Sequence, residues 1–442
     1  MKLFYALIIL LILSGCSFDK KSGIWKNVNE TVDKDDNNIF KDFKKISSST
    51  ETFDQIIPRD QKINFKKNKT FQNSSWTDIF FSRGNYTNNF KYDDLNQKIF
   101  KSKNLTNYSI NERVLFEKNN LILSDKRGNI IVYSITEKKT IAKVNFYKKK
   151  YKNVEKKINF IVDNDVIYIS DNIGYIYAYN YILDQILWAK NFKIPFRSNI
   201  KLFSEKLITS NQNNDLFIFD KANGNLKKLI PSENTTINNS FINNISLSNK
   251  EIFFLNTYGS IYSIDLDNFK FNWFINLNKT LDLNLSNLFY GSKVVYFDNK
   301  IFMSSNENFY VLDSKTGSIL IKKNFSSIFR PLINNDYIFL ITQNNFLVAL
   351  DKTNGKIIYS YDIAQQVANF INTKKRTLEI KELMLINNNI FVFLKNSHII
   401  KFNLNGDIKE IIKLPSTLNS YPIFIDKFLI FLNKKNKLVI VN

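Results

Sequence analysis

The chain has 442 residues, a formal net charge of +22 and a single cysteine, and 15% of its residues are aromatic. One cysteine excludes an internal disulfide and a zinc site built from several thiolates. The length and the apolar content allow one large hydrophobic core. Lysine and asparagine are spread along the whole sequence, so the charge indicates a solvated surface. Attraction to anionic lipid headgroups or to an acidic partner is the functional alternative.

The first fifteen residues have the composition of an export signal. Lys2 precedes an apolar run at 3–13, which is too short to span a bilayer core of about 20 residues. The next residues, LSGC at 13–16, resemble the bacterial lipobox. That resemblance implies that residues 1–15 are removed and that Cys16 is lipidated. An ordinary signal with a chance cysteine, or an uncleaved anchor, is the alternative. Export excludes nucleic acid as the normal partner.

Residues 16–70 are rich in charged and small polar residues and have no sustained apolar periodicity. Examples are the segments DKDDNN (33–38) and SSSTET (47–52). Such segments bury too little apolar surface to fold alone. We therefore expect residues 16–70 to form a flexible tether between a lipid anchor and a folded domain.

From about residue 71 the sequence consists of short strand-like runs separated by polar turns. One strand with its turn recurs eight times, as YSIT (133–136), YAYN (177–180), FIFD (217–220), YSID (262–265), YVLD (310–313), VALD (348–351), IKFN (400–403) and LVIV (438–441). The units follow one another at about 44 residues, a spacing typical of propeller blades of four strands.

The turns repeat as well as the strands. Glycine follows four residues after the aspartate of three units, at Gly224, Gly317 and Gly355. A large aromatic residue stands eight positions after the end of three units, at Trp188, Trp273 and Tyr359. We expect the glycines to adopt positive φ in tight turns and the aromatic residues to wedge between neighbouring sheets. The aspartates Asp220, Asp265, Asp313 and Asp351 are expected to accept backbone N–H bonds in these turns.

The final unit has no strand after it, because the sequence stops at Asn442. An open edge would invite aggregation, so we predict that a strand around Gln97–Lys103 completes the last blade. The fold class is therefore predicted as all-β, an eight-bladed β-propeller with four-stranded blades over residues 71–442, closed by an N-terminal strand. A β-sandwich, an open β-solenoid or several small β domains would not be expected to give eight matching units at one period.

Three turn segments, FIFDKANGNL (217–226), YVLDSKTGSIL (310–320) and VALDKTNGKIIY (348–359), resemble PQQ-type propeller repeats. With the lipobox, the eight units and the segment WTDIFFSRGNYTNN (76–89), the sequence resembles the BamB family of the outer-membrane β-barrel assembly machinery. The resemblance implies a non-catalytic scaffold without a cofactor, lipid-anchored at the periplasmic face of the outer membrane. It also implies two kinds of partner, the POTRA domains of a BamA-like subunit and unfolded outer-membrane proteins.

In the BamB family, a loop after a blade's outer strand carries an apolar pair and an arginine that contact BamA. The corresponding segment here is similar to that loop and reads KIPFRSN (193–199), which would assign partner binding to Ile194, Phe196 and Arg197. The alternative is a plain connection between blades, with Arg197 solvated and Phe196 packed inward.

Two other function classes remain open. A PQQ-dependent dehydrogenase uses the same repeats, but many of those enzymes carry a vicinal cysteine pair and calcium-binding carboxylates, and this chain has one cysteine. The only histidine, His398, lies in a strand-like run, and no P-loop or G-x-G-x-x-G segment is present, so we expect no catalysis. The remaining class is a propeller lipoprotein that binds another envelope component, such as peptidoglycan.

Overall fold

The computed structural model describes residues 16–18, 25–27, 53–147, 149–234, 241–278 and 289–442. The chain divides into two compact units, Met1–Glu51 and Thr52–Asn442. In the first unit, β1 (Cys16–Phe18) pairs with β2 (Trp25–Asn27) in an antiparallel hairpin. The predicted signal peptide, residues 1–15, lies outside the described residues, and so does most of the predicted tether before residue 53.

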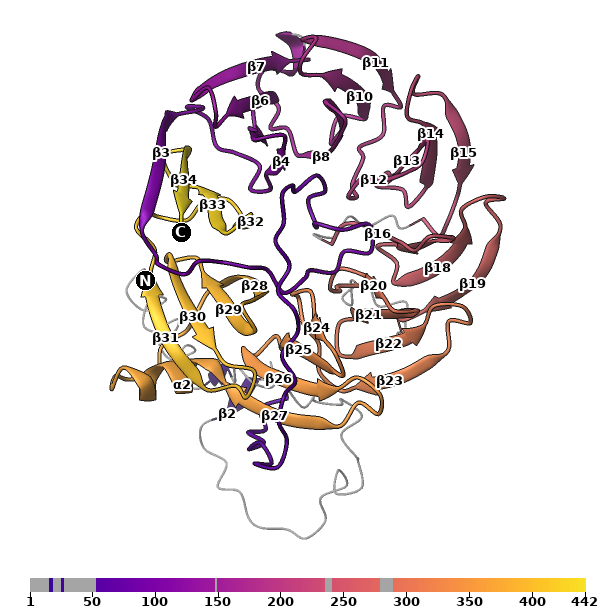
Figure 1. Ribbon diagram of the computed structural model, residues 1–442. Helices are drawn as coiled ribbons and strands as arrows, with labels where there is room; N and C mark the ends of the chain where they lie inside the picture. Colours follow the sequence, from indigo (N-terminus) through magenta and orange to yellow (C-terminus); the bar gives the residue numbers. More distant parts are fainter. Residues whose placement is uncertain (1–15, 19–24, 28–52, 148, 235–240, 279–288) are drawn as a thin grey trace, which may run out of the picture. The chain divides into compact units, whose positions relative to one another are not determined.

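The second unit contains eight four-stranded antiparallel sheets within its described residues, which we number as blades 1 to 8 in chain order (Figure 1). Blade 1 consists of β4 (Leu115–Glu117), β5 (Asn120–Ser124), β6 (Asn129–Ser134) and β7 (Lys139–Asn145), and blade 2 of β8 (Ile158–Asp163), β9 (Val166–Asp171), β10 (Tyr175–Asn180) and β11 (Gln185–Asn191). Blade 3 consists of β12 (Lys201–Phe203), β13 (Lys206–Ser210), β14 (Leu216–Asp220) and β15 (Leu226–Ile230), and blade 4 of β16 (Asn244–Leu247), β17 (Glu251–Leu255), β18 (Ser260–Asp265) and β19 (Phe271–Asn276). Blade 5 consists of β20 (Val295–Phe297), β21 (Lys300–Ser304), β22 (Phe309–Asp313) and β23 (Ile319–Lys323), and blade 6 of β24 (Leu332–Asn334), β25 (Tyr337–Ile341), β26 (Phe346–Asp351) and β27 (Ile357–Asp362). Blade 7 consists of β28 (Ile380–Ile386), β29 (Asn389–Leu394), β30 (His398–Phe402) and β31 (Ile408–Lys413), and blade 8 of β32 (Ile423–Ile425), β33 (Phe428–Leu432), β34 (Lys437–Val441) and β3 (Lys98–Asn104). This arrangement confirms the predicted eight-bladed propeller.

The predicted closure of the last blade is also confirmed. Strand β3 pairs antiparallel with β34, so the strand nearest the N-terminus of the propeller lies beside the end of the chain. The backbone of Gln97 exchanges hydrogen bonds with Asn442 at 3.3 and 3.1 Å. The open edge of β34 is therefore covered.

The middle strands of each blade are apolar on both faces because a neighbouring blade covers each face. In blade 1, every residue of β5 and β6 is buried. The outer strand faces solvent instead, and β19 of blade 4 contains no buried residue. This pattern explains why the inner runs of the sequence are continuously apolar and the outer runs alternate.

The glycine turns and the aromatic residues meet between blades, as predicted. Gly224 has a φ of +71°, and a Cβ on it would lie 2.4 Å from the indole of Trp188. The indole N–H of Trp188 donates a hydrogen bond of 2.9 Å to the carbonyl oxygen of Lys221, so blade 2 is joined to the turn of blade 3. Gly317 and Trp273 repeat this contact, and the Trp273 N–H donates to the Ser314 carbonyl at 2.9 Å.

The aspartates of these turns have the predicted role. The Asp313 carboxylate accepts hydrogen bonds from the backbone N–H groups of Lys315 and Thr316, both at 2.9 Å. These bonds lower the pKa of the Asp313 carboxyl group. The repeated aspartates thus stabilise the turns of the propeller.

Within the described part of the propeller, two short helical segments interrupt the repeats. The helix α2 (Ile363–Phe370) lies between blades 6 and 7, and its first turn is capped by the Asp362 carboxylate, which accepts from the Gln365 N–H at 3.1 Å. The 3-10 turn η1 (Lys149–Tyr151) lies between blades 1 and 2. The blade repeat did not predict either segment.

Residues 53–70, which we expected to belong to the flexible tether, are packed against the propeller in this structure. The ring of Phe53 lies 4.8 Å from that of Phe325, and the ring of Phe65 lies 4.5 Å from that of Tyr337. Ile57 forms an isolated β-bridge with Ser360 of β27. Isolated apolar residues in a polar segment bury little surface alone, but here they bind a preformed apolar surface, which composition does not reveal.

Candidate functional site

Residues 76–90 form a loop on the axis of the propeller, which we call the axial loop. In Figure 1 the indigo trace enters the centre of the ring, turns there, and leaves toward β3. Its backbone bonds to the innermost strands of several blades, through Trp76 with Phe116, Asp78 with Ile161, Arg83 with Leu247, Gly84 with Tyr296, and Phe90 with Leu385. The loop therefore lies on the axis and contacts inner strands that are far apart in the sequence.

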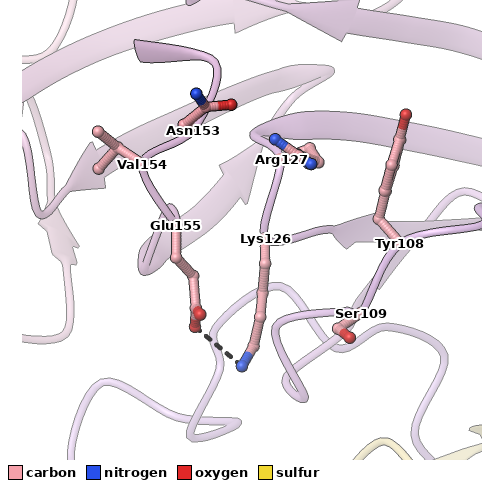
Figure 2. Close-up of a pocket in the computed structure, with 7 residues that line it drawn as sticks. All are labelled: Tyr108, Ser109, Lys126, Arg127, Asn153, Val154 and Glu155. Atoms are coloured by element: carbon pink, nitrogen blue, oxygen red, sulfur yellow. Dashed lines mark ion pairs between the residues drawn. The ribbon is translucent and has the colours of Figure 1, made fainter.

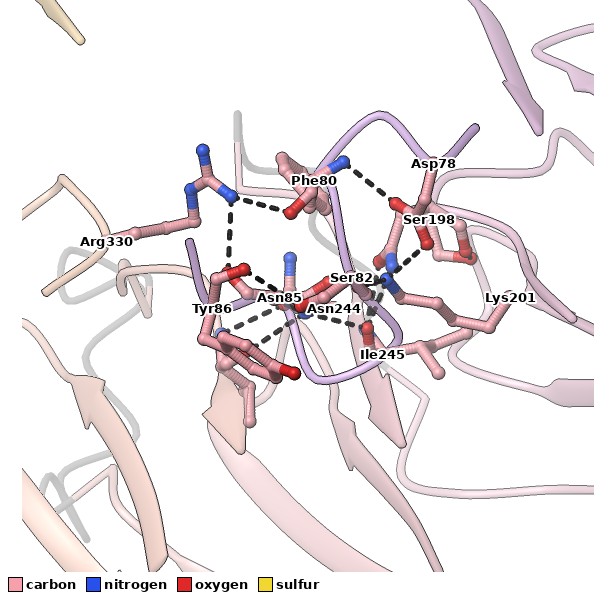
Figure 3. Close-up of polar contacts among 12 residues, drawn as sticks. Asp78, Phe80, Ser82, Asn85, Tyr86, Ser198, Lys201, Asn244, Ile245 and Arg330 are labelled. Atoms are coloured by element: carbon pink, nitrogen blue, oxygen red, sulfur yellow. Dashed lines mark hydrogen bonds and ion pairs between the residues drawn. The ribbon is translucent and has the colours of Figure 1, made fainter. Parts of the chain in front are cut away.

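A buried ion pair holds one side of the axial loop (Figure 3). The Lys201 ammonium lies 2.6 Å from the Asp78 carboxylate, and the exposed fractions of the two side chains are 0% and 6%. The same ammonium donates to the Ser82 carbonyl at 2.8 Å. Burial lowers the pKa of Lys201, and Asp78 opposes that shift. A buried lysine needs such a partner, so the pair fixes the loop to blade 3.

The turn of the axial loop is bonded from the opposite side. The Asn85 side-chain amide donates to the carbonyl oxygens of Ile245 at 2.9 Å and Val294 at 2.7 Å. The Arg330 guanidinium donates to the carbonyl oxygens of Phe80 at 2.8 Å and Asn85 at 3.2 Å (Figure 3). Blades 4, 5 and 6 thus satisfy polar groups that would otherwise be buried without partners.

The structure corrects the role predicted for Phe196. The segment that joins β11 to β12 contains this residue, and its side chain is 1% exposed. Its ring packs against Phe192 at 5.9 Å and Phe217 at 5.6 Å. A core side chain of this kind offers no surface to a partner, as the alternative interpretation of the segment held.

Ile194 and Arg197 lie in the same connection and are partly exposed. The backbone N–H of Arg197 donates to the Ser210 carbonyl at 2.9 Å, and burial lowers the pKa of its guanidinium. Both side chains remain predicted partner contacts.

Cys16, the predicted lipidation site, is the first residue of β1 and pairs with Asn27. Its modification stays a prediction. No helix among the described residues is long and apolar enough to cross a membrane.

A pocket of about 320 Å³ opens near blades 1 and 2 (Figure 2). Its wall includes Lys126 and Glu155, which form an ion pair of 2.8 Å. Arg127 lies 5.5 Å from the ring of Tyr108 and donates to the Lys152 carbonyl. The charged groups of this pocket are therefore largely bonded to the protein itself.

Two features expected of many PQQ-dependent dehydrogenases can be compared with this chain. The chain has one cysteine, so it cannot form a vicinal pair. Among the described residues, no three His, Cys, Asp or Glu side chains are grouped so as to hold a metal ion. The His398 ring lies 3.2 Å from the side-chain oxygen of its near neighbour Asn396.

The repeat pattern of the sequence did not predict the axial loop as a structural feature. The segment at 76–89 could be identified only by its resemblance to the opening of a family domain. The usable signals were Trp76 and the Gly84-Asn85 pair, since Asn85 has a positive φ of 62° in the turn.

Among solved structures, BamB from Moraxella catarrhalis is similar, with a TM-score of 0.61 and 12% identity over 78% of this chain and 99% of that one. A quinohemoprotein alcohol dehydrogenase from Pseudomonas putida HK5 has a TM-score of 0.60 and 8% identity over 84% of this chain and 80% of that one. The computationally designed Ika8 protein has a TM-score of 0.58 and 10% identity over 78% and 99%. At these identities the likeness shows the fold alone.

Sequence comparison indicates the family to which the chain belongs. No curated protein is significantly similar to the chain in sequence. Residues 140–361 and 273–406 match the family described as outer membrane protein assembly factor BamB. The two matches together span residues 140–406, which is more than half of the chain. The chain therefore belongs to the BamB family of outer membrane protein assembly factors.

Proposed function

We propose that this protein is a non-catalytic lipoprotein scaffold of the outer-membrane β-barrel assembly machinery. It binds the POTRA region of a BamA-like subunit and assists the insertion of unfolded outer-membrane proteins. The family match carries this proposal, and the filled axis of the propeller supports it. Cys16 would carry the lipid that anchors the protein at the periplasmic face of the outer membrane.

An apolar band on the outer strands supports a binding role. Blades 2 to 5 each expose large apolar side chains there, namely Leu187, Leu226, Leu229, Phe271, Phe274, Ile319 and Leu320. Phe274 is 62% exposed. Exposed apolar side chains in such number are typical of interaction surfaces. Outer strands also offer unpaired backbone groups, to which extended segments of unfolded barrel proteins can add.

Ile194 and Arg197 lie in the connection between blades 2 and 3, which both carry part of this band. An arginine pairs well with carboxylates across an interface, and a neighbouring apolar side chain supplies contact area. We assign the BamA contact to these two residues and omit the buried Phe196.

Binding of the purified POTRA region to the protein tests this assignment. The double variant Ile194→Ala, Arg197→Ala should bind at least about tenfold more weakly, which corresponds to about 1.4 kcal/mol. Lys409→Ala, at an exposed position of the outer strand β31 in blade 7 and away from the apolar band, is the control and should bind as the wild type does. Equal affinity of the double variant and the control would remove the site assignment.

Two other outcomes would favour the alternatives. Elution of a quinone from the purified protein would support the dehydrogenase class. Retention on purified peptidoglycan, without affinity for the POTRA region, would support a different envelope partner.

A further inference from the structure

The eight innermost strands place one equivalent residue each at the axis of the propeller. In seven blades this strand ends in a two-residue turn, and the equivalent residue stands four positions before the last paired one. In blade 4 the last strand pair is Leu247 with Ile252, but the Ser248 N–H donates to the Glu251 carbonyl at 3.0 Å, so the equivalent residue is counted from Ser248. We call these positions the axial ring. In blade order they are Arg113, Asn159, Asn199, Asn244, Lys293, Arg330, Glu382 and Tyr421.

The axial ring has a neutral side and a charged side. Blades 2, 3 and 4 supply asparagine, and two of these amides bond to the next blade. Asn199 accepts from the Ile245 N–H at 2.9 Å, and Asn244 accepts from the Val294 N–H at 2.9 Å. Blades 5 to 8 and blade 1 supply three cations, one carboxylate and one tyrosine. The charged side therefore carries an excess of positive charge.

The three cations of the axial ring converge on one point of the axial loop. Arg113, Arg330 and Lys293 lie 5.2, 5.5 and 5.7 Å from the centre of the Phe80 ring. Glu382 is the only carboxylate of the axial ring, and it lies 3.0 Å from Arg113 and 3.7 Å from Arg330. Asp78 also acts on Arg330 through its charge, but its carboxylate is paired with the Lys201 ammonium at 2.6 Å.

Two donors of this group lack a hydrogen-bond partner. The Nη2 atom of Arg330 is buried without a hydrogen bond, and its side chain is only 4% exposed. The Lys293 ammonium makes no hydrogen bond or ion pair within the described part of the chain, while burial, Arg113 and Arg330 lower its pKa to about 8. The Nη2 atom of Arg330 is the buried donor of the two, so its missing hydrogen bond is costly, and the like charges of Arg113 and Arg330 act against the Lys293 ammonium. A negatively charged group would satisfy both donors at once.

We propose that a small oxyanion, of phosphate or carboxylate type, binds at the propeller axis between the Lys293 ammonium and the Arg330 guanidinium, beside Phe80. Each charged oxygen accepts hydrogen bonds from the two cations and offsets the surplus charge of the axial ring. The site is separate from the outer apolar band, and it does not depend on the proposed scaffold role.

Calorimetric titration of the full mature chain with inorganic phosphate, and separately with acetate, tests the site. The buffer is a bulky sulfonate at constant ionic strength and about neutral pH. We expect one phosphate or acetate per chain, with affinity lowered at least about tenfold by Lys293→Gln. Lys228→Gln, a change of the same kind on the exposed strand β15, should leave the affinity unchanged.

Lys293→Arg keeps the charge and should restore binding, which separates loss of the ligand from a folding defect. Binding of phosphate alone or acetate alone would identify the class of the oxyanion. The proposal is overturned if neither anion binds the wild type, or if Lys293→Gln binds as tightly as the wild type.

Discussion

The large aromatic residue of an outer strand packs against the glycine turn of the next blade, and Trp188 is an example. Its indole covers Gly224 and donates to the Lys221 carbonyl, while its side chain is 8% exposed. A contact between neighbouring blades is thus part of the repeated sequence, and the stability of each blade depends on the blade that follows it.

Replacing Trp188 by alanine should lower the free energy of unfolding by about 3–5 kcal/mol, because it removes a large buried side chain and leaves a cavity. The adjacent Leu187 is 43% exposed on the same strand, and Leu187→Ala should cost less than about 1 kcal/mol. Urea unfolding of both variants checks this. Similar losses for the two would show that the contact between blades contributes little.

The Asp78–Lys201 pair makes the axial loop sensitive to a single charge. Asp78→Asn leaves a buried ammonium without its partner and should destabilise the domain by about 3–5 kcal/mol. Adding Lys201→Met should recover most of that loss. The exposed pair Lys139–Glu137 supplies the control, since Glu137→Gln should change stability by less than about 1 kcal/mol. Failure of the double variant to recover would refute the charge argument.

Lys293 predicts a specific dependence of stability on pH. Its pKa in the folded protein is lowered from 10.5 to about 8, first by burial and then by Arg113 and Arg330, while Glu382 opposes the shift. Between these two pKa values the unfolded chain holds a proton that the folded chain has lost. The free energy of unfolding should therefore rise with pH, by up to about 1.4 kcal/mol per pH unit.

Urea unfolding of the wild type and of Lys293→Met isolates this effect, since methionine does not titrate. In sulfonate buffer without phosphate, the stability of the wild type relative to Lys293→Met should increase from about pH 8 to about pH 10. A difference that is constant over this range, or that decreases, would contradict the lowered pKa.

Single residues were also where the sequence was least informative. The repeated aspartates, glycines and aromatic residues could be assigned roles, because a residue type that recurs at the same position of several units has the same structural role in each. Phe196 could not, since its burial depends on Phe217 of β14, which approaches it only when blades 2 and 3 are stacked. A connection between blades carries no periodic pattern that separates a core side chain from a contact residue.

At the level of elements, the ring is closed by one strand from the other end of the propeller sequence. Ser102 of β3 is buried, and its hydroxyl accepts from the Leu438 N–H at 2.9 Å. The neighbouring Lys101 is exposed and pairs with Val439. This strand joins the first and last blades, so its loss should affect the whole domain.

Ser102→Val should lower the free energy of unfolding by about 1–3 kcal/mol, because it leaves a buried backbone N–H without an acceptor. Lys101→Val, at an exposed position of the same strand, should change it by less than about 0.5 kcal/mol. Differential scanning calorimetry measures both. Equal effects would indicate that β3 closes the ring through edge pairing alone.

The sequence predicted this closure but not the axial loop, and the reason is physical. The closing strand follows from counting strands in a repeat, since one blade lacked a strand. The axial loop is held by contacts between distant residues, such as Lys201 with Asp78 and Arg330 with Phe80, and no local pattern encodes them. Likewise, the apolar residues at 53–70 show their role only against the folded blades.

At the scale of the whole molecule, the propeller is a ring of eight blades, and its own axial loop runs along the axis. Exposed large apolar side chains lie on the outer strands of blades 2 to 5, and the connection between blades 2 and 3 carries the partly exposed Ile194 and Arg197. The proposed partner-binding surface lies on the outer strands, away from the axis. That distribution suits a scaffold that holds partners side by side.

Co-purification from native membranes tests the central claim most directly. The full-length chain, with Cys16 intact and a C-terminal affinity tag, is isolated in mild detergent and its bound proteins are identified by mass spectrometry. The scaffold role predicts a BamA-like subunit as the main partner in about equal amount, retained after high-salt washing. Isolation of the tagged protein without any BamA-like subunit, although it is folded and membrane-bound, would contradict that role.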